Sequence, residues 1–195
     1  MNRRRVLVAL AGAALLMQGT PGLARESMQV KSIQLDLSPE DEAVLLSAQF
    51  VINLSAALKD AIERGLPLHF LTEYEIYRPR LLWLDEQTVE GQLEWRLSYH
   101  ALTRQYHLSS ARGSESFATL DEAISQMTSL RDWKVATVGQ FRREKEYVVR
   151  VRMRLDSGRL PKPFQMTALT DSDWNPQSAW KGLSFVVPTR PTPDQ

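Results

Sequence analysis

Histidine, serine and aspartate side chains are the groups in this sequence whose types and spacing could support catalysis or metal binding. His100 and His107 could face each other across a hairpin, where two imidazoles can share one metal ion. Ser98, His100 and Asp156 could likewise be assembled into a nucleophilic triad. All of these residues occupy outward or turn positions, where solvated side chains and ion pairs are the ordinary finding. We therefore predict neither a metal site nor a catalytic site from them.

A row of arginines is the most distinctive surface feature of the sequence. Arg150, Arg152 and Arg154 alternate with apolar residues, so they project from one face of a predicted strand about 7 Å apart. Such charges repel each other unless carboxylates or bound anions lie opposite. We favour pairing with carboxylates of neighbouring strands, and a docking stripe for an anion or a partner stays open as the alternative. The candidate carboxylates are Glu73, Glu75 and Glu94, of which the first two could do acid–base chemistry if buried.

The motifs and composition exclude several classes of protein. The nine glycines are scattered and form no phosphate-binding loop, and neither a G-x-S-x-G elbow nor an H-E-x-x-H helix occurs. The absence of cysteine excludes disulfides, iron–sulfur clusters, thiolate zinc sites and a cysteine nucleophile. A formal net charge of +1 is too close to neutral for a dedicated nucleic-acid binder. We therefore expect no cofactor, no nucleic-acid partner and no enzymatic activity.

The N-terminal segment has the three parts of a secretory signal peptide. Residues 1–5 carry three arginines and no acid, residues 6–17 are apolar, and small residues precede a cleavage site between Ala24 and Arg25. A helix of this apolar length reaches about 18 Å, which is well short of a bilayer's hydrocarbon core of about 30 Å. We therefore predict cleavage after Ala24, export to the periplasm, and a mature chain without a membrane span.

Alternation of apolar and polar residues predicts several strands, each with one face in a core and one in water. In the segment 93–100 the pattern places Trp95 and Tyr99 in the core and Arg96 and His100 outside. Similar alternation marks the segments 33–37, 44–54, 66–76, 147–155 and 183–187.

Two short helices are predicted between these strands. Ser55 can cap a helix that ends before Gly65, and Thr119 with Glu122 forms a capping box for a second one. Few helices among one-sided strands indicate an α+β fold, mainly antiparallel β-sheet and sandwich-like. We expect a signal peptide at 1–24, one β-rich domain at 25–187 and a proline-rich disordered tail at 188–195.

Four segments together carry a resemblance to a known family. They are LPLHF at 66–70, LSYHALTRQY at 97–106, RMRLD at 152–156 and LPKPFQ at 160–165. Their order and spacing resemble the proteobacterial family described as domain of unknown function 4390. The resemblance implies an exported bacterial protein without an assigned activity, and a gene often found beside that of a membrane sensor histidine kinase.

These features favour a periplasmic binding or accessory module that acts through a surface, with an envelope or membrane protein as its partner. The expected contact elements are the bend at 102–106, the arginine row, and a strap at 161–163 that its two prolines hold extended. A carrier of a lipid or another hydrophobic envelope molecule is the alternative, and an unrecognised hydrolase is a third possibility. The candidate binding residues are Arg104, Tyr106, Arg150, Arg152, Arg154, Lys162 and Phe164.

Overall fold

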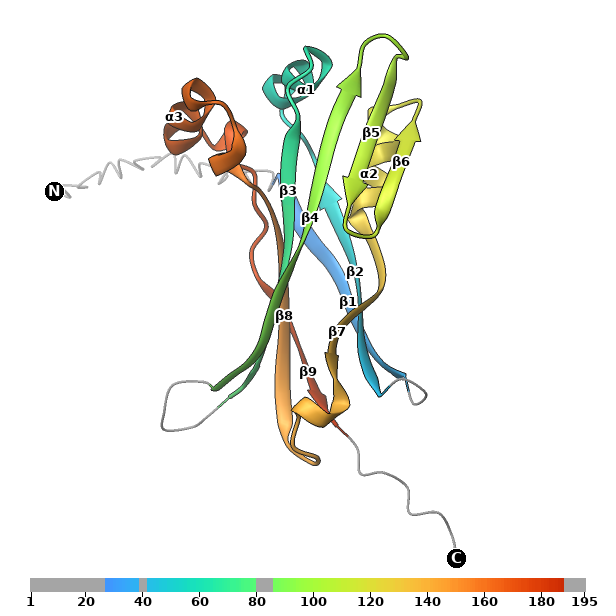
Figure 1. The fold of residues 1–195 in the computed structure, drawn as a ribbon. Helices are drawn as coiled ribbons and strands as arrows, with labels where there is room; N and C mark the ends of the chain where they lie inside the picture. The colour runs from blue at the N-terminus through green and yellow to red at the C-terminus, as the bar shows by residue number, and fades with distance from the viewer. Residues whose placement is uncertain (1–26, 39–41, 80–85, 188–195) are drawn as a thin grey trace, which may run out of the picture.

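Two antiparallel β-sheets face each other across one hydrophobic core (Figure 1). The structure, a computed structural model, describes residues 27–38, 42–79 and 86–187. The predicted leader with Ala24 and Arg25, and the predicted tail at 188–195, lie outside the described residues. Within those residues, no helix is both long and apolar enough to cross a membrane.

The smaller sheet has the strand order β1-β2-β7 and the larger one the order β6-β5-β4-β3-β8-β9. Every neighbouring pair is antiparallel, which confirms the predicted mainly antiparallel sheet. The strands are β1 (Met28–Ser38), β2 (Ala43–Ile52), β3 (Leu68–Arg78), β4 (Glu86–His100), β5 (Gln105–Ser110), β6 (Gly113–Phe117), β7 (Ser129–Thr137), β8 (Glu146–Leu155) and β9 (Lys181–Val186).

The core follows the predicted alternation of apolar residues. In β8 every second residue from Tyr147 to Leu155 is buried, and the arginines between them face outward. In β4 Trp95 is buried while Arg96 and His100 are exposed, as expected. Tyr99 is only half-buried, because it lies near the end of β4 beside an exposed turn, although its ring still packs against Tyr106.

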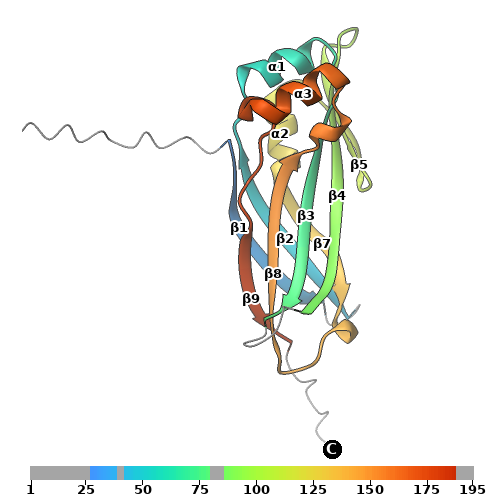
Figure 2. The same ribbon diagram turned by 90° about the vertical axis from the view of Figure 1, so that its left-hand side faces the viewer.

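One irregularity in β1 explains how its apolar residues share a face. The pairing with β2 shifts between Val30 and Ser32, which is the signature of a β-bulge. Because the extra residue changes the parity of the strand, Val30 before the bulge and Ile33 after it can both contribute to the core. Strand β1 also lies beside β9, at one edge of the larger sheet (Figure 2), where the Lys181 ammonium donates to the Lys31 carbonyl oxygen at 2.8 Å.

Both predicted helices form, with the predicted caps. In α1 (Ala56–Glu63) the Ser55 hydroxyl accepts from the Leu58 amide at 3.2 Å. Gly65 follows the helix with φ at +90°, a left-handed conformation that glycine adopts readily. In α2 (Leu120–Thr128) Thr119 and Glu122 form the reciprocal capping box.

A third helix corrects the prediction of two helices and of an extended strap at 161–163. Helix α3 (Lys162–Thr170) begins immediately after Pro161, and Pro163 lies in its first turn. Proline is tolerated there because the first amides of a helix have no partner within the helix. The side-chain amide of Gln165 donates to the carbonyl oxygens of Gly158 and Leu160, at 2.7 Å each, and fastens the helix to the preceding turn.

Tyr74 links the two sheets through the core. From β3, its hydroxyl donates to the carbonyl oxygen of Val135 in β7 at 2.7 Å, and its ring meets the edge of Trp133 with centroids 4.9 Å apart. On the neighbouring strand β4, Gly91 pairs with Tyr74. A Cβ atom at Gly91 would lie 2.6 Å from a ring carbon of Tyr74, so the position requires glycine.

Candidate functional site

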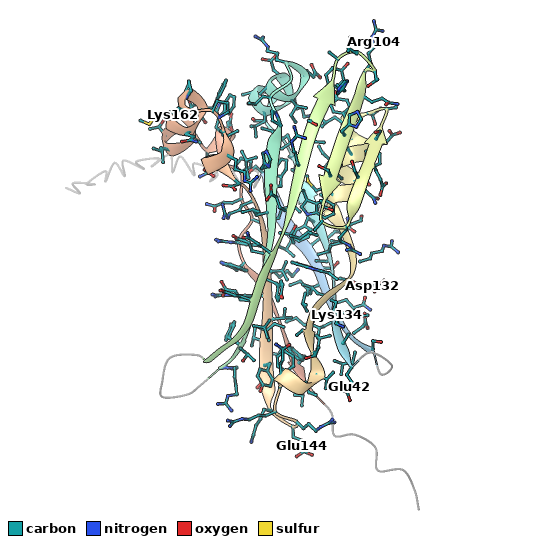
Figure 3. All side chains as sticks on the ribbon, viewed as in Figure 1. Glu42, Arg104, Asp132, Lys134, Glu144 and Lys162 are labelled. Carbon is teal, nitrogen blue, oxygen red and sulfur yellow. The ribbon has the colours of Figure 1, made fainter. Side chains whose placement is uncertain are left out.

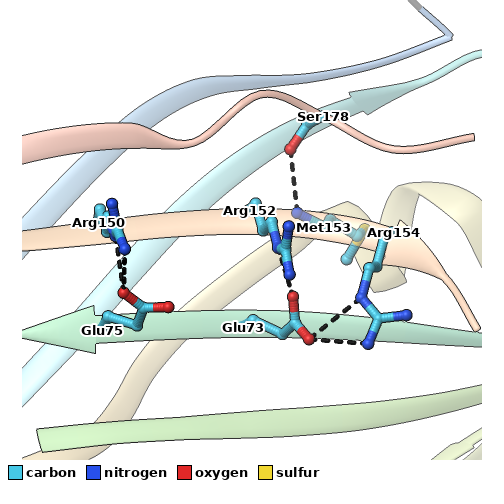
Figure 4. A network of polar contacts seen from close by, with 7 residues as sticks. All are labelled: Glu73, Glu75, Arg150, Arg152, Met153, Arg154 and Ser178. Atoms are coloured by element: carbon cyan, nitrogen blue, oxygen red, sulfur yellow. Dashed lines mark hydrogen bonds and ion pairs between the residues drawn. The ribbon is translucent and has the colours of Figure 1, made fainter.

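The arginine row is paired with carboxylates on the outer face of the larger sheet. Strand register sets Arg150 opposite Glu75 and Arg152 opposite Glu73 (Figure 4). Glu75 accepts a hydrogen bond from Arg150 Nε at 2.8 Å. Glu73 accepts from Arg152 through one oxygen, and through the other it accepts from Arg154 Nε and Nη2 at 3.1 and 2.9 Å. The pairing that we favoured from the sequence is therefore confirmed for Glu73 and Glu75.

The charge state of Glu73 follows from these contacts. Burial by itself raises the pKa of this carboxyl, because a charged group loses solvation. Hydrogen bonds and positive charge from Arg154 and Arg152 outweigh that effect, so the pKa of Glu73 lies below its ordinary value. Glu73 is thus ionised near neutral pH and serves the arginine row as a counter-ion, so it is a poor candidate for a general acid.

Aromatic rings cover part of the same arginine row. The guanidinium carbons of Arg150 and Arg152 lie 4.9 and 4.5 Å from the ring centroid of Trp180, and Arg150 also lies 5.3 Å from that of Tyr77. Cation–π contacts of this kind hold guanidinium groups against the sheet. Trp180 precedes β9, and the sequence pattern had not connected it with the arginines. Each of the three arginines is therefore held by a carboxylate, and two of them also by a ring, which favours a structural role for the row.

Ser98, His100 and Asp156 do not form a catalytic triad. Ser98 and His100 lie on β4, whereas Asp156 follows β8, and strand β3 separates the two. The Asp156 amide donates to the carbonyl oxygen of His69 in β3 at 2.7 Å. Two strand spacings amount to about 10 Å, too far for hydrogen-bonded proton transfer.

Glu94, the third candidate carboxylate, belongs to a separate ion cluster on the same outer face. It contacts His69 Nδ1 at 3.0 Å and Arg159 Nη1 at 2.8 Å, so it is not a partner of the arginine row.

His100 and His107, which were considered as metal ligands and not predicted to bind metal, do face each other across the β4–β5 pair. The ring centroids of His100 and His107 are 5.4 Å apart, and His107 Nδ1 lies 3.0 Å from the Ser116 hydroxyl. Among the described residues, no group of three or more histidine, cysteine or acidic side chains could hold a metal ion. Two ligands without a third make a weak site, so the arrangement gives no support to metal binding.

Two of the predicted contact elements lie at the same end of the molecule, on either side of α1, and we call this end the helical end (Figure 1). It is formed by α1, α3 and the turn between β4 and β5, and Figure 3 shows Arg104 and Lys162 there, with Glu42 and Glu144 at the opposite end. Arg104 has a φ of +54°, so the turn holds a long side chain in a left-handed conformation that ordinarily favours glycine. Neither Arg104 nor Lys162 has a side-chain partner among the residues that the structure describes.

Apolar side chains accompany these two cations. Leu102 in the turn is 92% exposed, and Met166 and Leu169 in α3 are 67% and 78% exposed. Met166 and Leu169 were not identified from the sequence, because the prediction placed an extended strap at 161–163 and no helix after it. Prolines stand at the start of α3 and no side chain caps it, so its sequence gives little sign of a helix. Ala168 is the only buried residue of α3, so the helix also lacks a clear apolar face.

Two other candidate binding residues face inward. Tyr106 lies in the core, 9% exposed, with its ring 4.9 Å from that of Tyr99. Burial raises the pKa of Tyr106, and the nearby Glu63 carboxylate raises it further. Phe164 is half-buried and stacks on Trp174 with centroids 4.8 Å apart. Both rings therefore pack against other aromatic rings of the protein, and neither exposes much surface to a partner.

The family described as Domain of unknown function (DUF4390) matches residues 25–184. The chain belongs to this family. No curated protein and no solved structure matches the chain.

The family match covers nearly all of the described residues. In this DUF4390 chain the matched range reaches from before β1 into β9, so the three α-helices of the described residues and all strands but the end of β9 lie within it. The family description assigns no activity, so we infer the function of this DUF4390 chain from its surface.

Proposed function

We propose that this protein is an exported accessory module of the cell envelope that binds a protein partner through its helical end. One observation carries the proposal. The three most exposed large apolar side chains of the described residues, Leu102, Met166 and Leu169, all lie at that end. Large exposed apolar side chains at one end of a molecule commonly mark a protein–protein contact, because burying them there removes them from water.

The chemistry of the partner follows from the charges around these residues. Arg104 lies two residues from Leu102, and Lys162 opens the helix that carries Met166 and Leu169. The complementary surface is an apolar patch bordered by carboxylates. The periplasmic part of a membrane sensor kinase is the partner that the family resemblance suggests. The arginine row is left out of the contact surface, because each of its arginines is already paired with Glu73 or Glu75.

The test compares two sets of substitutions of the same chemical kind. The first variant carries Leu102→Ser, Met166→Ser and Leu169→Ser, and the control carries Leu183→Ser and Val186→Ser, which are exposed apolar positions in β9, outside the helical end. Cross-linking in the intact periplasm should yield a defined partner adduct with the native chain and the control, and a strongly reduced adduct with the first variant. Equal adduct from both variants, or equal loss from both, would refute docking at the helical end.

Export is tested separately. N-terminal sequencing of the protein from the periplasmic fraction should begin at Arg25, because cleavage after Ala24 releases the leader. A full-length chain retained in the inner membrane would contradict this part of the proposal.

The carrier alternative finds no specific support. Five of the surface clefts among the described residues have volumes of about 260–530 Å³, and each of these five has at least one charged side chain in its wall. A lipid chain requires an apolar lining, because charged groups would be desolvated without compensation.

A further inference from the structure

A polar cleft opens where the two sheets separate, away from the helical end. It has a volume of about 530 Å³ and is bordered by the β5–β6 hairpin on one side and by the junction of α2 with β7 on the other. Figure 1 shows the β5–β6 hairpin in front of α2, beside the start of β7. The volume is that of a small-molecule site.

The inner face of the larger sheet changes character at this cleft. Trp95 and Leu108 continue the apolar core, but the positions that pair with them, Ser110 and Glu115, are polar, and Gly113 opposite Ser110 has no side chain. Ser110 is half-buried, and Gly113 and Glu115 are exposed, so this part of the sheet faces an open cleft and not the core. Here the polar side chains line a space that a ligand could fill.

Two arginines enter the wall of this cleft from opposite sides. Arg112 comes from the turn between β5 and β6, and Arg131 comes from β7. In contrast to Arg150, Arg152 and Arg154, neither makes an ion pair or a side-chain hydrogen bond with any residue that the structure describes. Both arginines are exposed, so their guanidinium groups are available to an anion that enters the cleft.

The remaining polar groups of the wall suit hydroxyl groups. Ser125 and Gln126 from α2 and Ser129 from β7 offer neutral donors and acceptors. One oxygen of the single carboxylate in the wall, Glu115, already accepts from Gln126 Nε2 at 3.3 Å. The Thr128 hydroxyl donates to the carbonyl oxygens of Ile124 and Ser125. These hydrogen bonds offset part of the negative charge at the C-terminal end of α2, which would otherwise repel an anion.

We propose that this cleft binds a small hydroxyl-bearing organic anion, whose carboxylate or phosphate is held by Arg112 and Arg131. The guanidinium fork forms charge-assisted pairs with either group. The wall of Trp95 and Leu108 contacts the apolar face of the ligand, and the serine hydroxyls bind its hydroxyl groups. This site is separate from the helical end, so binding there is independent of the proposed partner.

The experiment is an NMR titration of the purified ¹⁵N-labelled chain with glucuronate, glucose 6-phosphate and uncharged glucose at constant ionic strength. We expect saturable shifts of the amides of Arg112, Gly113 and Arg131 with one or both anions, and at least about tenfold weaker binding of glucose. The Arg112→Ala/Arg131→Ala variant should bind the anion at least about tenfold more weakly, since two charge-assisted contacts are lost.

Arg142→Ala is the matched control, because Arg142 is exposed and lies outside the cleft. It removes one positive charge and should leave the affinity unchanged. A preference for glucuronate assigns the site to carboxylates, and a preference for glucose 6-phosphate assigns it to phosphates. Shifts that do not saturate, shifts spread over the whole surface, or an equal loss of affinity in Arg142→Ala would overturn the proposal.

Discussion

Replacing Glu73 with glutamine tests whether the arginine row is held by its carboxylates. The Glu73 side chain is 16% exposed and accepts hydrogen bonds from both Arg152 and Arg154. A hydrogen bond to a charged group contributes about 1.5–3 kcal/mol, and partial exposure reduces that figure. Because glutamine keeps one acceptor oxygen and the same shape, we expect Glu73→Gln to lower the free energy of unfolding by about 2 kcal/mol at pH 7.

The matched control is Glu75→Gln. Glu75 pairs with Arg150 alone, and that arginine side chain is 40% exposed. An exposed pair of this kind contributes little, so the expected loss is about 0.5–1 kcal/mol. Urea unfolding followed by circular dichroism measures both changes, provided that the slope with denaturant stays constant. Equal losses of stability in the two variants would show that Glu73, which bridges two arginines, stabilises the fold no more than Glu75, which pairs with one.

The pH dependence of the same variant gives an independent check. The pKa of Glu73 in the folded protein lies below its ordinary value of 4.5, so the unfolded chain takes up a proton at higher pH than the folded one. The contribution of Glu73 is therefore complete above the unfolded pKa and is lost as pH falls through the folded pKa. The stability gap between the native chain and Glu73→Gln should narrow below about pH 4.5. A gap that stays constant or widens toward acid would refute the assignment of Glu73 as an ionised counter-ion.

Two further predictions concern the core. Trp95→Ala should lower the free energy of unfolding by about 3–5 kcal/mol, because it leaves a cavity. His100→Ala, at an exposed position, should lower it by less than about 0.5 kcal/mol. Equal losses in denaturant unfolding would contradict the observed alternation of buried and exposed residues in β4. Gly91→Ala should lower the free energy of unfolding by about 1–3 kcal/mol, because it forces a Cβ atom against Tyr74. Gly139→Ala is the control, because there is open space around Gly139, and it should leave the stability nearly unchanged. Thermal unfolding of both variants measures the difference.

Much of the fold could be predicted from the sequence, because the signals involved are local. Alternation along β8 decides which side chains face the core, and the caps at Ser55 and Thr119 are formed by groups three residues apart. Where a local signal was ambiguous, the prediction was wrong. A proline both favours extended backbone and suits the first turn of a helix, and only the contacts of Gln165 with the preceding turn and the packing of Phe164 on Trp174 make α3 the outcome.

The surfaces depended on tertiary structure, because they join residues that are far apart in the chain. The sequence by itself determined that Arg150, Arg152 and Arg154 share a face, and it supplied Glu73 and Glu75 as candidate partners. Only the β3–β8 register decided that Glu73 bridges two arginines while Glu94 binds elsewhere, since a shift by one residue would turn every side chain to the other face. The gathering of exposed apolar residues at the helical end, and of unpaired arginines around the cleft, likewise results from the packing of separate elements, which no local pattern encodes.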